Sequence, residues 1–196
     1  MSKVVDFYWD VGSTNTYFAV FQLPPILKRT GASVRYHPLN LGYMFRANNY
    51  VLSEEPREKL RYRKRDLERW AELAGLPFKI PDRFPIKTSR ALRGAIAMRH
   101  WELEVDYIQA IFKAYWEEGI IVEDYPVLRQ IAEGLGVDGV DFEQRSESEE
   151  VRQVMIQTHD AALQKGVFGA PTFLVGDEMF WGKDRLDFLE RELVGD

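Results

Sequence analysis

The chain contains no cysteine. This absence excludes disulfide bonds, thiolate catalysis, Cys-x-x-Cys redox chemistry and cysteine-based zinc sites. A thiol–disulfide oxidoreductase is therefore excluded, and any sulfur nucleophile must come from a bound cofactor. Histidine is also scarce: His37, His100 and His159 lie far apart and have no metal-ligand spacing. We therefore expect neither a metal site nor a histidine-based catalytic triad.

Long apolar runs and an excess of positive charge are missing as well. No apolar segment approaches the roughly 18 residues that a membrane helix needs, and the N-terminal residues lack the pattern of a signal peptide. The formal net charge of −5 gives no bulk attraction to nucleic acid or anionic lipid. The basic tract Arg57–Arg69 has acidic residues interleaved at helical spacing, which indicates a solvated helix face. We expect a cytoplasmic protein that binds neither nucleic acid nor membrane.

What is present is a chain of 196 residues, 45% hydrophobic and rich in aromatic side chains. Its first forty residues have the pattern strand, turn, helix, strand. Residues 3–9 and 33–39 predict strands. The turn Asp10–Thr14 offers capping residues for a helix that ends near Gly31. This order is the start of a right-handed parallel βαβ unit.

The C-terminal part predicts helix, strand, strand, helix. The first helix is expected over Ser146–Lys165, and the strands over Thr172–Val175 and Glu178–Trp181 with a hairpin turn between them. The last helix begins near Lys183. It is expected to turn four apolar side chains inward: Leu186, Phe188, Leu189 and Leu193.

The middle of the chain, from Glu54 to Leu135, has helical periodicity, with an apolar stripe formed by Leu60, Leu67, Trp70, Leu73 and Ala74. The βαβ start and the αββα end together have the thioredoxin arrangement. We therefore predict a thioredoxin-like α/β fold. Residues 1–45 and 146–196 would form the thioredoxin-like domain, and residues 46–145 an inserted all-helical subdomain.

Two residues stand where such a fold binds ligands. Ser13 follows the first strand at the N-terminus of the first helix. Its hydroxyl could stabilise a thiolate that a ligand brings, or it could simply cap the helix with Thr14. Pro171 stands at the mouth of the third strand, where local chemistry fits either a plain strand start or a cis bond. In the thioredoxin order, a cis-proline at this place can lie beside the active site.

The segment Gly182–Arg185 is the third candidate. It combines a first helical turn with one acid between two bases. Such a group suits a zwitterionic ligand, with N–H groups and Lys183 for a carboxylate and Asp184 for an ammonium. The alternative is capping by Asp184 and a solvated ion pair.

Four segments of the chain resemble one family in order and over nearly the whole length: DFYWDVGSTNTYFA (6–19), RDLERWAELAGLPF (65–78), GVFGAPTF (166–173) and FWGKDRLDFLE (180–190). The family is that of the glutathione-dependent 2-hydroxychromene-2-carboxylate isomerases, relatives of kappa-class glutathione transferases on the DsbA-like thioredoxin fold. The resemblance implies interconversion of a 2-hydroxychromene-2-carboxylate and an open-chain aryl-pyruvate in the degradation of aromatic compounds. A glutathione thiolate would add to the conjugated system, allow rotation about the former double bond, and then be eliminated.

The resemblance also implies roles for individual residues. Ser13 would be the catalytic residue and hold the glutathione sulfur. Ala170, before a cis-Pro171, would pair its backbone with the cysteinyl part of glutathione like an added strand. Gly182, Lys183 and Asp184 would hold the γ-glutamyl end. Phe168 completes the set expected to bind glutathione.

The expected substrate-binding residues follow the second strand. Family members have a cationic side chain and an asparagine near the substrate carboxylate, and an ungapped alignment puts these positions at Phe45 and Ser53. The neighbouring Arg46, Asn48 and Asn49 could replace them, and Phe84 completes the set. A further departure is that the family reads Ser-Pro after the first strand, where this chain has Ser13-Thr14.

Two alternatives remain open. One is a kappa-like glutathione transferase that acts on another electrophile, and the other is a non-catalytic binding protein with a thioredoxin fold. The expected partners are glutathione and a small aromatic carboxylate. A homodimer is an expectation from the resemblance alone, because family members are often dimers.

Overall fold

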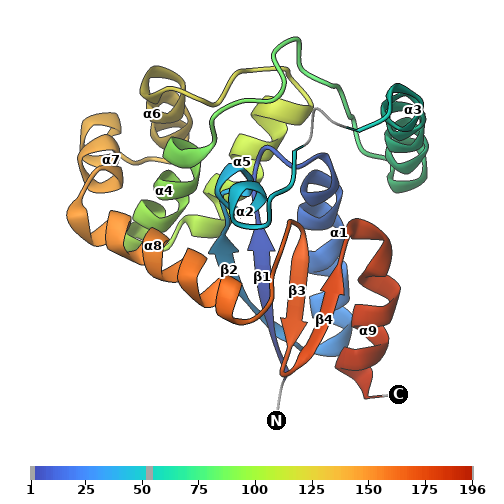
Figure 1. Cartoon of the computed structure of the whole chain (residues 1–196). Helices are drawn as coiled ribbons and strands as arrows, with labels where there is room; N and C mark the ends of the chain where they lie inside the picture. The colour runs from blue at the N-terminus through green and yellow to red at the C-terminus, as the bar shows by residue number, and fades with distance from the viewer. Residues whose placement is uncertain (1–2, 52–54, 196) are drawn as a thin grey trace.

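A mixed four-stranded sheet forms the centre of the protein in a computed structural model that describes residues 3–51 and 55–195 (Figure 1). The strand order is β2-β1-β3-β4. The sheet contains β1 (Val4–Trp9), β2 (Ser33–Pro38), β3 (Thr172–Val175) and β4 (Glu178–Trp181). β1 runs parallel to β2 and antiparallel to β3, and β3 runs antiparallel to β4. The four predicted strands and the βαβ start are confirmed.

Helices cover both faces of this sheet. α1 (Thr14–Thr30) and α9 (Leu186–Val194) lie on one side, and α8 (Glu149–Gln164) lies on the other (Figure 1). Side chains of β1 alternate between the two faces, because successive Cβ atoms of a strand point in opposite directions. Phe7 and Trp9 enter the main apolar core with α1, whereas Tyr8 enters a smaller cluster with Ala162 of α8. The predicted thioredoxin-like α/β fold is confirmed.

The middle of the chain is helical, as predicted. It contains α2 (Leu41–Ala47), α3 (Arg57–Ala74), α4 (Ser89–Met98), a 3₁₀ turn (Arg99–Trp101), α5 (Glu104–Trp116), α6 (Tyr125–Gly134) and α7 (Gly139–Ser146). Residues of α4 and α5 pack into the same apolar core as β1 and α1. The boundaries proposed for the inserted subdomain fall inside α2 and α7, and the subdomain stays a prediction.

Three details of the sequence interpretation are wrong. Phe188 is 53% exposed, whereas Leu186, Leu189 and Leu193 are buried. These leucines are spaced i, i+3 and i+7 on one helix face, and Phe188, two residues after Leu186, lies on the opposite face. The helix predicted over Ser146–Lys165 is present as α8, but it starts three residues later than predicted, because Ser146 ends α7 and Ser148 caps α8.

The apolar stripe expected along α3 is the third error. Leu67 is buried, but Leu60 is exposed and Leu73 is 77% exposed. α3 contacts α1. Trp70 and Ala74 are partly buried and pack against the core together with Leu67, so the stripe holds only in the C-terminal half of α3. Its basic residues face solvent and form local ion pairs, such as Arg65 with Glu68, which confirms the predicted solvated face.

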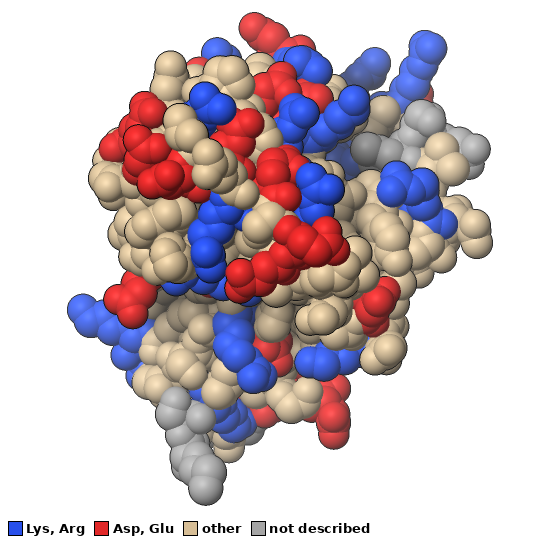
Figure 2. All heavy atoms as spheres, turned by 90° about the vertical axis from the view of Figure 1, so that its left-hand side faces the viewer, with Lys and Arg blue, Asp and Glu red and all other residues tan. Residues whose placement is uncertain are grey.

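The surface carries both signs of charge. Figure 2 shows Lys and Arg side chains interspersed with Asp and Glu over the face formed by the helices left of the sheet in Figure 1. Within the described ranges, none of the helices is long and apolar enough to cross a membrane.

Candidate active site

Ser13 caps α1 and also reaches across to the loop before β3. Its Oγ accepts a hydrogen bond from the Thr16 N–H at 3.2 Å, which is N-cap geometry. The same hydroxyl donates to the Ala170 carbonyl oxygen at 3.0 Å. Ser13 is buried at this junction. Ser13 therefore caps the helix and contacts the predicted ligand loop at the same time. The first residue of the helix is Thr14, where the family has a proline.

Asp10 fixes the turn that presents Ser13. Its Oδ1 accepts from the Gly12 N–H at 2.9 Å, an Asx turn, and its Oδ2 accepts from the Leu41 N–H at 2.8 Å. The Thr88 hydroxyl also donates to Oδ2. Burial raises the pKa of Asp10 to about 6, and the hydrogen bonds from Leu41, Gly12 and Thr88 partly oppose this rise. One buried carboxyl thus ties the Ser13 turn to the start of α2.

The loop before β3 has an open backbone donor beside Ser13. The Ala170–Pro171 peptide bond is cis, and β3 begins directly after it at Thr172. Among the described residues, the Ala170 N–H has no hydrogen-bond partner, although Ala170 is buried. Buried backbone donors without a partner are rare. This N–H and the neighbouring carbonyl can therefore pair with the backbone of an extended ligand.

Two half-exposed aromatic rings adjoin this loop. Phe168 and Trp181 pack in a tilted pair, with their centroids 5.1 Å apart and an interplanar angle of 60°. The Trp181 indole lies so close to Gly169 that a Cβ there would meet its Nε1 at 3.1 Å. The predicted residue Phe168 is thus brought next to Ala170 by sequence and by this ring pair.

Gly182 starts the turn that carries Lys183 and Asp184. Its φ of 107° favours glycine, and a Cβ at this position would lie 2.5 Å from Asp184 Oδ1. The Gly182 N–H donates to the Pro171 carbonyl at 2.9 Å. This hydrogen bond joins the turn to the cis-proline loop. The first N–H groups of the helical turn that follows have no intrahelical partner.

Lys183 and Asp184 serve different partners. The ammonium of Lys183 is buried, donates to Asn15 Oδ1 at 3.0 Å and lies 4.6 Å from the ring centroid of Trp70. Burial lowers the pKa of Lys183, while Asp66 and Asp184 raise it. Asp184 is exposed and pairs with Arg185 at 2.7 Å. The lysine therefore joins this turn to α1 and α3, and the aspartate carboxylate remains accessible to a ligand.

The expected substrate-binding residues are not gathered in one place. In α2, the Phe45 ring packs against Tyr50 at 4.9 Å, and Asn48 donates to the Met44 carbonyl. Asn49 is exposed with a φ of 53°. Arg46 is exposed and lines a separate pocket that Ser13 does not line. Ser53 lies outside the described residues.

Phe84 is connected to the Ser13 turn through Trp116, which contacts both. Its half-exposed ring lies 5.7 Å from that of Trp116, and the Trp116 indole donates to the Val11 carbonyl at 2.7 Å. Val11 is two residues before Ser13. Phe84 can therefore form an aromatic wall for a ligand that lies over this turn.

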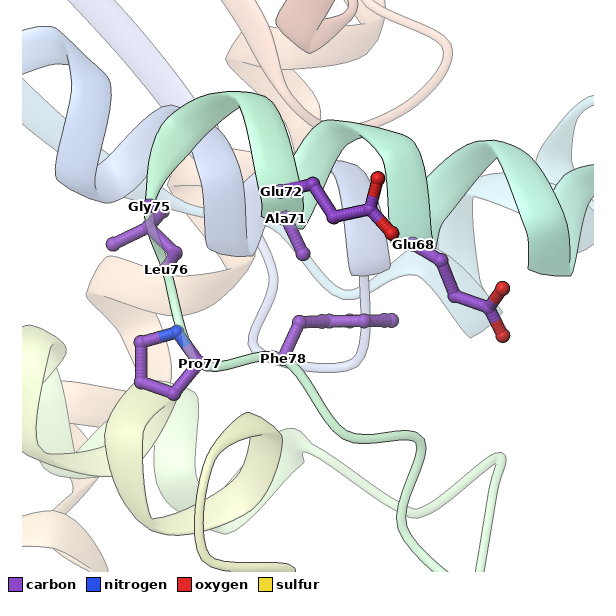
Figure 3. Close-up of a pocket in the computed structure, with 7 residues that line it drawn as sticks. All are labelled: Glu68, Ala71, Glu72, Gly75, Leu76, Pro77 and Phe78. Carbon is purple, nitrogen blue, oxygen red and sulfur yellow. The ribbon is translucent and has the colours of Figure 1, made fainter.

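A surface hollow of about 530 Å³ contains none of the predicted site residues. Figure 3 shows it at the end of α3, where the Phe78 ring lies under the helix and Glu68 and Glu72 project from it. Within the part of the chain that the structure describes, no three His, Cys, Asp or Glu side chains gather as a metal site would require.

The sequence interpretation missed four residues of the site. Asp10 could have been found, because Asp-x-Gly is a local Asx-turn pattern. Asn15, Thr88 and Trp116 act through partners at least 78 residues away along the chain, and no local pattern marks them.

These features define a class of protein: a cysteine-free thioredoxin fold in which a serine faces a cis-proline loop. The family model for the DSBA-like thioredoxin domain matches residues 4–194. A 2-hydroxychromene-2-carboxylate isomerase of Sphingobium xenophagum is 34% identical over 99% of this chain and 100% of its own. A solved structure of such an isomerase has a TM-score of 0.86 and 32% identity over 97% of this chain and 94% of its own. The chain belongs to the family of DsbA-like 2-hydroxychromene-2-carboxylate isomerases.

A more distant relative is named as a transferase. Glutathione S-transferase kappa 2 of Caenorhabditis elegans is 26% identical over 98% of this chain and 94% of its own.

Proposed function

We propose that this protein is a glutathione-dependent isomerase that interconverts a 2-hydroxychromene-2-carboxylate-type compound and its open-chain aryl-pyruvate. The observation that carries the proposal is the Ser13 hydroxyl at the Ala170 carbonyl, beside an unpartnered Ala170 N–H and the cis-Pro171. The names of the isomerase relatives and of the kappa transferase support it.

The residues around Ser13 fit the cysteinyl part of glutathione. The unpartnered N–H of Ala170 can donate to a ligand carbonyl and so add an extended peptide to the loop. The Ser13 hydroxyl now donates to Ala170 and would turn its hydrogen toward a sulfur that lies in front of the helix N-terminus. The first N–H groups of α1 and this hydroxyl would then stabilise negative charge on the sulfur.

The turn at Gly182 fits the γ-glutamyl end. Its first N–H groups can bind a carboxylate, and the exposed Asp184 can accept from an ammonium. Lys183 holds this turn against α1 through Asn15, so its role is to orient the turn and add positive charge nearby. The bound glutathione would supply the thiol that adds reversibly to the conjugated bond of the substrate.

The aromatic body of the substrate would lie against the Phe84 ring beside the Ser13 turn, and Phe45 of α2 stays a prediction for the substrate. Phe84 is held by Trp116, and Phe45 is carried by α2, whose first N–H is fixed by Asp10. Asn48, Asn49 and Ser53 stay predictions for the substrate carboxylate. The expected homodimer also stays a prediction.

The decisive experiment is an absorbance assay of a 2-hydroxychromene-2-carboxylate with and without glutathione. We expect the open-chain product to form when glutathione is present, with no loss of glutathione over many turnovers. Consumption of glutathione with an electrophile such as a chlorinated aromatic compound, and no isomerisation, would instead identify the kappa-like transferase. Failure of glutathione to bind in calorimetry would favour the non-catalytic binding protein.

Reversing the charge of Asp184 should weaken glutathione binding. The variant Asp184→Lys replaces the acceptor of the γ-glutamyl ammonium with a like charge, and we expect the Kd to rise about ten-fold or more. Asp187→Lys is the matched control, because Asp187 is an exposed aspartate of the same helical region with the same change in charge. Isothermal calorimetry on both variants checks this, and equal affinities would remove Asp184 from the site.

A further inference from the structure

A second pocket, of about 340 Å³, lies where α2, α4 and α8 meet. Figure 1 shows α4 and α8 beside α2, on the side away from α3. Its volume falls in the range of pockets that hold small organic molecules, about 300–1,000 Å³. None of the residues proposed above to bind glutathione lines it.

Positive charge gathers in this pocket. Arg46 of α2, Arg93 of α4 and Arg152 of α8 all line it. Arg93 and Arg152 share one carboxylate, Glu147, with both N–O distances at 2.5 Å. Among residues 3–51 and 55–195, Arg46 forms no ion pair. Three guanidinium groups thus line the pocket, and one carboxylate, Glu147, pairs with two of them, in a protein whose net charge is −5.

The remaining wall is aromatic and apolar. The rings of Tyr43 and His159 stack with centroids 4.7 Å apart and an interplanar angle of 14°. His159 Nε2 accepts from the Asn40 N–H at 3.0 Å, so the ring is held as a neutral imidazole with its hydrogen on Nδ1. Ile156 of α8 is half exposed beside this pair. The wall therefore offers a flat ring and an aliphatic side chain next to the arginines.

We propose that this pocket binds a small aromatic carboxylate, separately from the Ser13 site. The carboxylate lies among Arg46, Arg93 and Arg152, where guanidinium groups form charge-assisted hydrogen bonds, and the ring lies against Tyr43 and Ile156. An inorganic anion would leave the apolar wall uncovered, and a neutral ring would leave Arg46 without a counter-charge. The pocket therefore selects a ligand that carries both groups.

The pocket is connected to the Ser13 turn by one chain of hydrogen bonds. The Asn40 side chain, which lines the pocket, donates to the Thr88 hydroxyl at 3.3 Å, and Thr88 donates to Asp10. A ligand in this pocket would contact α2, and the N-terminus of α2 is hydrogen-bonded to Asp10 in the turn that precedes Ser13.

The probe for this proposal is 2-naphthoate, compared with 2-naphthol, which lacks the charge, and with inorganic phosphate, which lacks the ring. We expect calorimetry to give a Kd for 2-naphthoate about ten-fold or more below that of either comparator. Backbone amide shifts in NMR spectra of the full chain should occur at Tyr43, Ser89 and Ile156. Shifts confined to Ala170 and Gly182, or phosphate binding as tight as 2-naphthoate, would overturn the proposal.

Variants identify the residues. Arg46→Gln should raise the Kd for 2-naphthoate about ten-fold, and Ile156→Asp, which adds a carboxylate on a half-exposed position, should abolish binding. Arg65→Gln on α3 is the control, because Arg65 is an exposed arginine far from the pocket lining and should leave the Kd unchanged. An unchanged Kd in Arg46→Gln would contradict the assignment.

Discussion

The variant Ser13→Ala is expected to lower kcat/KM of the glutathione-dependent isomerisation by about 10²–10³-fold. This magnitude is what removal of one positioned hydrogen-bond donor costs when charge develops in the reaction. The hydroxyl is buried, lies at the N-terminus of α1 and faces the Ala170 carbonyl, so it is positioned to donate to charge that develops there. The absorbance assay with saturating glutathione measures the effect.

The same variant also removes a helix cap, and the two effects must be separated. Loss of an N-cap serine costs about 1 kcal/mol of stability. Ser148→Ala is the matched control, because Ser148 caps α8 in the same way, through the Val151 N–H at 3.3 Å, and lies outside the proposed site. Both variants should lose similar stability in urea unfolding, and only Ser13→Ala should lose turnover. If Ser13→Ala keeps normal turnover, Ser13 only caps the helix and has no catalytic role.

The variant Gly94→Ala is expected to lower the free energy of unfolding by about 1–3 kcal/mol, the usual cost of overpacking. Gly94 lies in α4, where a Cβ would be 2.7 Å from Cζ of Phe142 and would also contact the Tyr107 hydroxyl oxygen. Both rings are fully buried and cannot move into solvent. The helix-propensity gain of alanine over glycine, about 1 kcal/mol, offsets only part of this cost. Urea unfolding followed by circular dichroism measures the change.

Gly134→Ala is the control for this substitution, since it lies at the end of α6 and a Cβ there meets nothing within 4 Å. It should leave stability unchanged or slightly higher. Tyr107→Phe removes one of the clashing atoms, a buried hydroxyl that has no hydrogen-bond partner in the described part of the chain. The double variant Gly94→Ala/Tyr107→Phe should therefore recover part of the lost stability. If Gly94→Ala has wild-type stability, the rings of Phe142 and Tyr107 can move to accommodate the methyl group, and the predicted overpacking is wrong.

The fold was predictable because its signals are local. β1 and β3 follow from short runs of β-branched and aromatic residues, β4 follows from the hairpin turn that precedes it, and α1 follows from the capping turn before it. The exposure of Phe188 could also have been predicted from local spacing, because Phe188 lies two residues after Leu186 and therefore on the helix face opposite to Leu186, Leu189 and Leu193.

The site was predictable only in part, because its contacts join distant segments. Ser13 and Ala170 lie 157 residues apart along the chain, and the thioredoxin order alone predicts that they meet. Lys183 was expected at the ligand, yet its partner is Asn15, 168 residues away, and no periodicity reports such a contact. Arg46 lines the second pocket because it is carried by α2, a seven-residue helix that the sequence pattern does not indicate.

The buried carboxyl of Asp10 also couples folding to proton uptake. Its pKa is about 6 in the folded protein, because burial outweighs its hydrogen bonds, against 3.8 for an exposed aspartate. A group with a raised folded-state pKa contributes stability in full below its unfolded pKa and loses that contribution as the pH rises through the folded pKa. Between about pH 4 and pH 6, folding therefore takes up a proton at this residue. At neutral pH the protein keeps, three residues before Ser13, an ionised carboxylate whose protonation would favour the folded state.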